Sequence, residues 1–295
     1  MEESKLRKSL KAHFEFGNHP ICLASEKTNE VIGTIFQQLT FTNQSGEHIR
    51  AFYAPPKSGK PSPAILYIHA HGGRYDIGAD ELIHGRPALV APLGQVLADL
   101  GYAVLCIDLP GFGGRADKSE SELAKKSLWY GRSLAGQMIG ELHSSFEFLS
   151  NQEGINPERI GLFGISMGAT LAYWLAAAEC RVSMLAHLCC FANFDELIKT
   201  NVHDLHGIYL TVPNLLNTAS NGQIAGSIAP RPQLVGIGDH DPLTPPHATD
   251  PALEELRVAY SDVAENLVVI RESETGHVET PRMRQATIEF FTSLR

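Results

Sequence analysis

The sequence predicts an α/β fold with a mostly parallel, twisted sheet that carries helices on both faces. Short, continuous apolar runs recur along the chain, and such runs are typical of strands buried on both faces of a sheet. These runs alternate with segments of helical spacing, which favours right-handed crossovers between parallel strands. Near the N-terminus, two β-like runs joined by a turn add an antiparallel hairpin.

The N-terminal part of the chain comes before the alternating pattern. A polar helical arm is expected over residues 1–30, because Leu6, Leu10 and Phe14 recur at helix-like spacing. The hairpin follows over residues 31–54, where an Asn-Gln-Ser-Gly turn separates its two runs. A loop rich in proline and glycine then leads into the main sheet.

Six apolar runs are predicted as the strands of the main sheet, and helices are expected between and after them. The strands are expected at 64–69, 102–108, 159–165, 182–190, 232–238 and 266–272, and the helices at 87–101, 133–150, 167–179, 249–260 and 281–294. Residues 191–231 interrupt the pattern, and an excursion of about forty residues is usually a lid or a binding loop. No internal repeat is visible, so a single domain over 1–295 is predicted.

Charge and composition exclude several classes of partner. The 24 lysines and arginines are outnumbered by 33 aspartates and glutamates, which gives a formal net charge of −9. No basic patch is visible, and this argues against a nucleic-acid partner. The charged N-terminus lacks the apolar core of a signal peptide, and no segment approaches the roughly 18 apolar residues of a membrane span. The five cysteines include no C-x-x-C pair. We therefore expect a cytoplasmic protein without a membrane partner, and nothing indicates a homo-oligomer.

One serine has the sequence context of a nucleophile. Residues 164–168 read Gly-Ile-Ser-Met-Gly, a G-x-S-x-G motif between a predicted strand and a predicted helix. Small residues two before and two after Ser166 let the strand and the helix approach closely, and the sharp turn exposes the hydroxyl. The start of the helix then brings the Met167 N–H beside a developing oxyanion. A glycine-rich turn with an incidental serine is the alternative interpretation.

A serine nucleophile needs a base and an orienting carboxylate, and both follow later strands in the required order. The strand at 232–238 runs into Asp239 and Asp241, and the strand at 266–272 is followed by His277. Of the 13 histidines, His277 is the one between the last strand and the last helix. Asp241 is the preferred acid, and Asp239 would then cap the same turn.

The second oxyanion donor is expected in the loop after the strand at 64–69. This loop reads His-Ala-His-Gly-Gly-Arg-Tyr, and its glycines allow backbone N–H groups to point into the site. The donor is expected to be the His71 N–H, or alternatively that of Gly72. His69 is expected to hold the loop by hydrogen bonds. Possible substrate contacts are Arg74, Tyr75 and Tyr209.

A metal site is the rival interpretation of the same loop. His69 and His71 form an H-x-H pair, and the carboxylates and imidazoles at 76, 80, 84 and 239–241 could complete a zinc or binuclear centre. That interpretation leaves Ser166 and His277 without a role. A dinucleotide site is excluded more simply, because no glycine cluster completes G-x-G-x-x-G at a strand–helix turn.

From about residue 31 to its end, the chain resembles the α/β-hydrolases, and within them the dienelactone-hydrolase-like and acetyl-xylan-esterase-like group. The matching pieces are HAHGGRYDIG, IDLPGFGGR, GISMGA, HGIYLTVPNLL, IAPRPQLVGIGDHDPLTPP and TGHVETPRM. The resemblance implies an α/β-hydrolase fold with Asp241 as acid and His277 as base. Two features depart from the group. Dienelactone hydrolases proper use a cysteine where this chain has Ser166, and the usual His-Gly before the oxyanion residue reads His69-Ala70.

Together these features predict a serine carboxylic-ester hydrolase that acts on a small-molecule ester through Ser166, His277 and Asp241, without a cofactor or a metal. The resemblance to acetyl esterases implies short acyl chains. The alternatives are a peptidase, an amidase or an acyl transferase with the same three residues. A non-catalytic binding protein of the same fold and a metal-dependent hydrolase are further alternatives.

Overall fold

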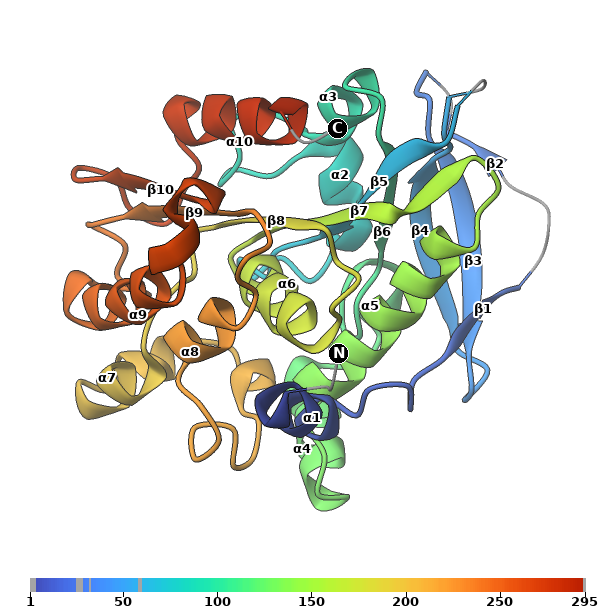
Figure 1. Cartoon of the computed structure of the whole chain (residues 1–295). Helices are drawn as coiled ribbons and strands as arrows, with labels where there is room; N and C mark the ends of the chain where they lie inside the picture. Colours follow the sequence, from blue (N-terminus) through green and yellow to red (C-terminus); the bar gives the residue numbers. More distant parts are fainter. Residues whose placement is uncertain (1–3, 25–28, 32, 58–59, 294–295) are drawn as a thin grey trace.

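The computed structural model describes residues 4–24, 29–31, 33–57 and 60–293. In this part of the chain, ten strands form one sheet in the order β1-β3-β4-β6-β5-β7-β8-β9-β10, with β2 paired to β3 (Figure 1). The strands are β1 Ile21–Leu23, β2 Asn29–Glu30, β3 Gln37–Asn43, β4 His48–Ala54, β5 Ser62–Ile68, β6 Ala103–Ile107, β7 Ile155–Ile165, β8 Met184–Leu188, β9 Gln233–Gly238 and β10 Leu267–Glu272.

The direction of the strands confirms the predicted sheet. Strands β6, β5, β7, β8, β9 and β10 pair in parallel with their neighbours. Strands β1, β3 and β4 pair antiparallel, and β4 joins the parallel part by an antiparallel pairing with β6. Every residue of β6, β8 and β9 is buried, as expected for strands covered on both faces.

Helices cover both faces of this sheet, and each face has its own hydrophobic core. The helices are α1 Lys5–His13, α2 Glu81–His84, α3 Gly94–Asp99, α4 Glu120–Trp129, α5 Leu134–Ser150, α6 Met167–Ala178, α7 Phe194–Lys199, α8 Asn221–Gly226, α9 Pro246–Ala259 and α10 Pro281–Ser293. Helices α2, α3 and α10 pack into one core. Helices α1, α5, α6, α8 and α9 pack into the other, on the opposite side of the strands (Figure 1).

Helix α6 carries Ser166 at its N-terminal end and is buried along its whole length. Guanidinium groups bind carbonyl oxygens at its C-terminal end, where the negative end of the helix dipole lies. Arg231 donates to the Ala176 oxygen at 2.7 Å and to the Glu179 oxygen at 3.0 Å, and Arg7 donates to the Ala177 oxygen.

Some predicted elements have other limits in the structure. The helix expected at 87–101 is wrong in its first half, since α3 begins only at Gly94, after Pro92. A proline inside a helix removes a backbone hydrogen bond and clashes with the preceding turn. The arm expected to be helical over 1–30 is helical in α1, but its later part contributes β1 at the sheet edge; residues 1–3 and 25–28 lie outside the described residues. Helix α4 was not anticipated.

The excursion at 191–231 contains α7, the 3₁₀ turns Val202–Leu205 and Ile208–Leu210, and α8. Its side chains Phe191, Tyr209, Leu215 and Ile224 belong to the same core as α5 and α6. The segment therefore packs onto the body of the protein. Within the described residues, no helix combines the length and the apolar character needed to cross a membrane.

Candidate active site

Ser166 stands at a sharp turn between β7 and α6. Its backbone has φ 58° and ψ −121°, a conformation that residues other than glycine rarely adopt and that costs on the order of 1–3 kcal/mol. The Ser166 N–H donates to the Leu188 carbonyl in the neighbouring β8 at 2.8 Å, which helps to hold the turn. Ser166 is 9% exposed, at the carboxyl end of the parallel strands.

The two glycines of G-x-S-x-G are required by close packing, as the sequence predicts. A Cβ on Gly164 would collide with the carbonyl oxygen of Gly168, one turn into the helix. A Cβ on Gly168 would collide with the carbonyl oxygen of Ile68 at the end of β5. Helix α6 therefore begins directly against the end of β5, and the loop that follows β5 lies beside Ser166.

His277 links Ser166 to a buried carboxylate. Its Nε2 lies 2.7 Å from Ser166 Oγ, and its Nδ1 lies 2.7 Å from Asp241 Oδ2. Asp241 also accepts the Leu243 N–H at 2.9 Å and the Thr244 hydroxyl at 3.0 Å. With Asp241 ionised, His277 donates from Nδ1, so Nε2 is free to accept the serine proton.

Hydrogen bonds keep Asp241 ionised in spite of its burial. Burial alone would raise the pKa of this carboxyl. The hydrogen bond and the charge of His277, together with the bonds from Leu243 and Thr244, outweigh burial and hold the pKa of Asp241 below its ordinary value.

The loop after β9, which carries Asp241, meets the loop after β10, which carries His277, because β9 and β10 are parallel neighbours and end at the same edge of the sheet. The Asp239 N–H donates to Glu272 and the His240 N–H donates to Thr275, both at 2.9 Å, so backbone bonds join the two loops. Asp239, the alternative acid, points elsewhere: its Oδ1 accepts from Arg271 at 2.6 Å. The structure therefore brings Asp241, and not Asp239, to His277.

The N–H groups expected to bind an oxyanion are available. Among the described residues, the Met167 and His71 N–H groups have no hydrogen-bond partner, and neither has the Gly72 N–H. Ala70, the residue before His71, is held by hydrogen bonds on both sides. Its N–H donates to Glu81 at 3.0 Å, and its carbonyl accepts from Arg86 Nη2 at 2.9 Å and from His69 Nδ1 at 3.0 Å.

His71, Tyr75 and Tyr209 gather around Glu120, the first residue of α4. Glu120 accepts the His71 Nε2–H at 2.7 Å, the Tyr75 hydroxyl at 2.8 Å and the Tyr209 N–H at 2.8 Å. The His71 and Tyr209 rings stack at 5.6 Å. Burial would raise the pKa of Glu120, but these bonds outweigh it and lower the pKa. Arg74 is exposed and ion-paired with Asp76.

The excursion is thus tied to both sides of the site. The Tyr209 N–H bond to Glu120 joins it, through the bond between Glu120 and His71, to the loop after β5. On the other side, His206 donates to the Leu243 carbonyl in the loop after β9 at 2.9 Å. The excursion itself lines a mostly apolar, half-open pocket of about 430 Å³, to which Phe194, Ile208 and other side chains of the excursion contribute.

Residues that sequence reasoning missed include Glu81, Arg86 and Glu120. Glu120 follows Ser119, which caps α4 with its hydroxyl, and that pattern marks the start of a helix. No local pattern indicates that Glu120 reaches His71, because the two residues meet only through the tertiary fold.

The histidines of the rival metal interpretation are bound to protein groups. His69 donates to the Ala70 carbonyl and accepts the Leu109 N–H, and His71 bonds to Glu120 and accepts the Gly73 N–H. In the described ranges, the one group of potential metal ligands within 4.8 Å of one another is His143, Glu147 and Glu179. Arg181 already pairs with both of its carboxylates.

Comparisons with known proteins agree with this architecture. The model of the alpha/beta hydrolase fold family matches residues 63–221. YtaP of Bacillus subtilis, which its name places among the hydrolases, is 38% identical over 275 residues, 92% of each chain.

Two solved structures share the fold. The acetyl xylan esterase of Paenibacillus sp. R4 superposes with a TM-score of 0.66 at 17% identity, covering 100% of this chain and 96% of that one. Acetyl xylan esterase 1 of Thermoanaerobacterium sp. superposes with a TM-score of 0.61 at 17% identity, covering 100% and 99%. The match of the family model and the identity with YtaP show that the chain belongs to the α/β-hydrolase family.

Proposed function

We propose that the protein is a serine-dependent carboxylic-ester hydrolase with Ser166, His277 and Asp241 as its catalytic triad. The observation that carries the proposal is the unbroken line of hydrogen bonds from Asp241 through His277 to Ser166 Oγ, with 2.7 Å at each step. Nucleophile, base and orienting acid in this geometry are the arrangement that activates a serine hydroxyl.

In the proposed reaction, Ser166 Oγ attacks the ester carbonyl while its proton passes to His277 Nε2. The carbonyl oxygen becomes an oxyanion, and the intermediate collapses when His277 returns the proton to the leaving alcohol. A water molecule, deprotonated by His277, then attacks the acyl-enzyme and releases the acid and free Ser166. Asp241 keeps His277 in the Nδ1–H tautomer and stabilises its positive charge.

The Met167 and His71 N–H groups are the proposed oxyanion donors, with the Gly72 N–H as the alternative to His71. Removing one such donor typically raises a barrier by about 3 kcal/mol. Met167 N–H belongs to the first turn of α6, where backbone N–H groups are unpaired and the helix dipole favours negative charge.

For the substrate, we propose esters with short acyl chains and a cytoplasmic site of action. The acyl preference is supported by the acetyl xylan esterases among the structural neighbours. The location is supported by the five cysteines, all of which are free thiols, as is usual in reducing compartments. Tyr75 and Tyr209 lie beside His71 and are proposed to border the substrate, whereas Arg74 would have to leave Asp76 to reach it.

The decisive experiment compares wild type with Ser166→Ala on p-nitrophenyl acetate and with a fluorophosphonate probe. We expect the wild type to hydrolyse the ester and to be labelled at Ser166, and the variant to fold and do neither. Undiminished turnover by Ser166→Ala would contradict the proposal. A panel of esters, amides and aminoacyl arylamides distinguishes an esterase from a peptidase, an amidase or an acyl transferase, and a wild type without labelling would indicate a binding protein.

A further inference from the structure

His69 lies between the loop after β6 and the loop after β5. We propose that His69 is a positioning residue in a directional chain of hydrogen bonds that runs from the buried Arg115 to the His71 N–H and polarises that oxyanion donor. The inference rests on the proposed function, because it assigns a role to groups behind the same site.

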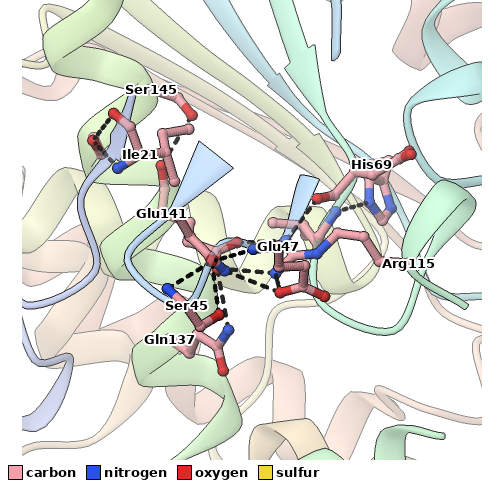
Figure 2. A network of polar contacts seen from close by, with 12 residues as sticks. Ile21, Ser45, Glu47, His69, Arg115, Gln137, Glu141 and Ser145 are labelled. Atoms are coloured by element: carbon pink, nitrogen blue, oxygen red, sulfur yellow. Dashed lines mark hydrogen bonds and ion pairs between the residues drawn. The ribbon is translucent and has the colours of Figure 1, made fainter. Parts of the chain in front are cut away.

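The chain begins at Arg115, which lies in the polar network drawn in Figure 2. Arg115 pairs with the buried Glu141 through two bonds, Nη1 to Oε2 at 2.6 Å and Nη2 to Oε1 at 3.0 Å, and Nη2 also bonds to Glu47 at 2.7 Å. Arg115 Nη1 donates in addition to the backbone carbonyl of Asp108 at 3.0 Å. A fixed guanidinium therefore acts on the carbonyl end of the peptide that joins Asp108 to Leu109.

The other end of that peptide binds His69. The Leu109 N–H donates to His69 Nε2 at 3.1 Å. Since an N–H group can only donate, Nε2 is the unprotonated nitrogen, and the neutral ring carries its hydrogen on Nδ1. His69 is completely buried, and burial lowers its pKa to about 4, in agreement with a neutral ring at neutral pH.

The last link connects His69 to the proposed oxyanion donor. His69 Nδ1–H donates to the Ala70 carbonyl at 3.0 Å, and Arg86 Nη2 donates to the same oxygen at 2.9 Å. In a trans peptide, the carbonyl and the following N–H point in opposite directions. Two donors on the Ala70 carbonyl therefore fix the direction of the His71 N–H.

All the dipoles of this chain point the same way. Arg115 donates to one peptide, that peptide donates to His69, and His69 donates to the peptide of His71. Hydrogen bonds in series polarise one another, so each donor upstream makes the His71 N–H a stronger donor. The charge that this N–H stabilises develops in the transition state, so the effect is expected in kcat and not in KM.

Two substitutions of His69 separate its two hydrogen bonds. The amide of His69→Gln reaches the position of Nε2, where it can accept from Leu109, and loses the donor to Ala70. The amide of His69→Asn reaches the position of Nδ1, where it can donate to Ala70, and loses the bond to Leu109. We expect kcat for p-nitrophenyl acetate to fall about tenfold in His69→Gln and only a few-fold in His69→Asn, with KM unchanged in both.

The far end of this series of hydrogen bonds is tested by Arg115→Lys. Lysine keeps the positive charge and lacks the two Nη donors of the guanidinium. We expect kcat to fall about two- to threefold with KM unchanged. The matched control is Arg231→Lys, a partly buried guanidinium that also donates to backbone carbonyls, at the end of α6 opposite Ser166. Its kcat should equal that of wild type even where its thermal stability falls.

Nuclear magnetic resonance of the ¹⁵N-labelled protein gives a readout that does not depend on activity. We expect His69 to carry its hydrogen on Nδ1, and the His71 amide proton to move upfield in Arg115→Lys and not in Arg231→Lys. A His69 hydrogen on Nε2, an unmoved His71 amide in Arg115→Lys, or an unchanged kcat in His69→Gln would overturn the inference. If wild type neither hydrolyses esters nor reacts with the fluorophosphonate probe, the proposed function fails. The series of hydrogen bonds is still tested by the resonances of His69 and of the His71 amide.

Discussion

The hydrogen bonds of Asp241 make Asp241→Asn a sharp test of the proposed mechanism. In the native carboxylate, Oδ2 accepts from His277 Nδ1 at 2.7 Å and from Thr244 Oγ1 at 3.0 Å, and Oδ1 accepts from the Leu243 N–H at 2.9 Å. All three partners are donors, so the site suits a group with acceptors on both sides.

Asparagine cannot satisfy these donors in either orientation. If its amide nitrogen faces the Leu243 N–H, two donors meet at hydrogen-bond distance. If its amide nitrogen faces His277, it donates to Nδ1, and the imidazole hydrogen moves to Nε2. We expect the second arrangement, in which His277 can no longer accept the proton of Ser166.

A base held in the wrong tautomer lowers kcat by about 10⁴-fold, which corresponds to roughly 5.5 kcal/mol of barrier. The assay is kcat and KM for p-nitrophenyl acetate, with circular dichroism to verify folding. The matched control is Asp239→Asn, in the same turn but bonded to Arg271, and it should retain the wild-type kcat. A kcat for Asp241→Asn within tenfold of wild type, or equal losses in both variants, would refute the reasoning.

Three further predictions follow from groups around the site. Burial lowers the pKa of His69 to about 4 and that of His187 to about 3 from 6.5, so the unfolded chain binds more protons below pH 6.5. The free energy of unfolding, measured by urea titration, should therefore be about 4 kcal/mol lower at pH 5 than above pH 6.5. In His187→Leu this loss should be about half as large. Gly168→Ala places a methyl group against the Ile68 carbonyl and should lower the free energy of unfolding by about 3 kcal/mol, whereas a wild-type midpoint would contradict the packing. Prolonged dialysis against EDTA should leave ester hydrolysis unchanged; a loss restored by zinc would favour a metal mechanism.

It could be predicted that Ser166, Asp241 and His277 lie close together in space, because each lies next to a strand with a strong local pattern. Ser166 follows β7, Asp241 follows β9 and His277 follows β10, and the carboxyl ends of parallel strands lie along one edge of a sheet. Strand order and position along the chain were therefore enough to expect these side chains close together. Their catalytic role remains for the experiments above.

The groups behind the oxyanion loop could not be predicted in the same way. Arg115 reaches Glu141 and Glu47, 26 and 68 positions away, and each residue alone has the pattern of an ordinary surface charge. Such ion pairs depend on how the hairpin, the loop after β6 and α5 pack together. Sequence periodicity carries no information about that packing.

Local rules also failed where competing contacts decided the structure. The apolar spacing of residues 87–101 indicates a helix, but the prolines restrict helix formation to α3. Ile21–Leu23 follows a helix in sequence, but it pairs with β3 and extends the sheet. A strand of three residues at a sheet edge is defined by its partner and has too few residues to show alternation.

The attachment of residues 191–231 has a kinetic consequence. A segment that gates an active site must exchange between open and closed states, and such motions on the microsecond-to-millisecond timescale limit many turnover rates. Here Phe191, Tyr209 and Ile224 are anchored in the main core, and bonds to Glu120 and Leu243 hold the segment on both sides. Opening it would expose that core to water, so we expect the segment to keep the same position in the free and the loaded enzyme. Substrate selection would then act through a site of fixed shape, and product would leave by diffusion without waiting for a conformational change.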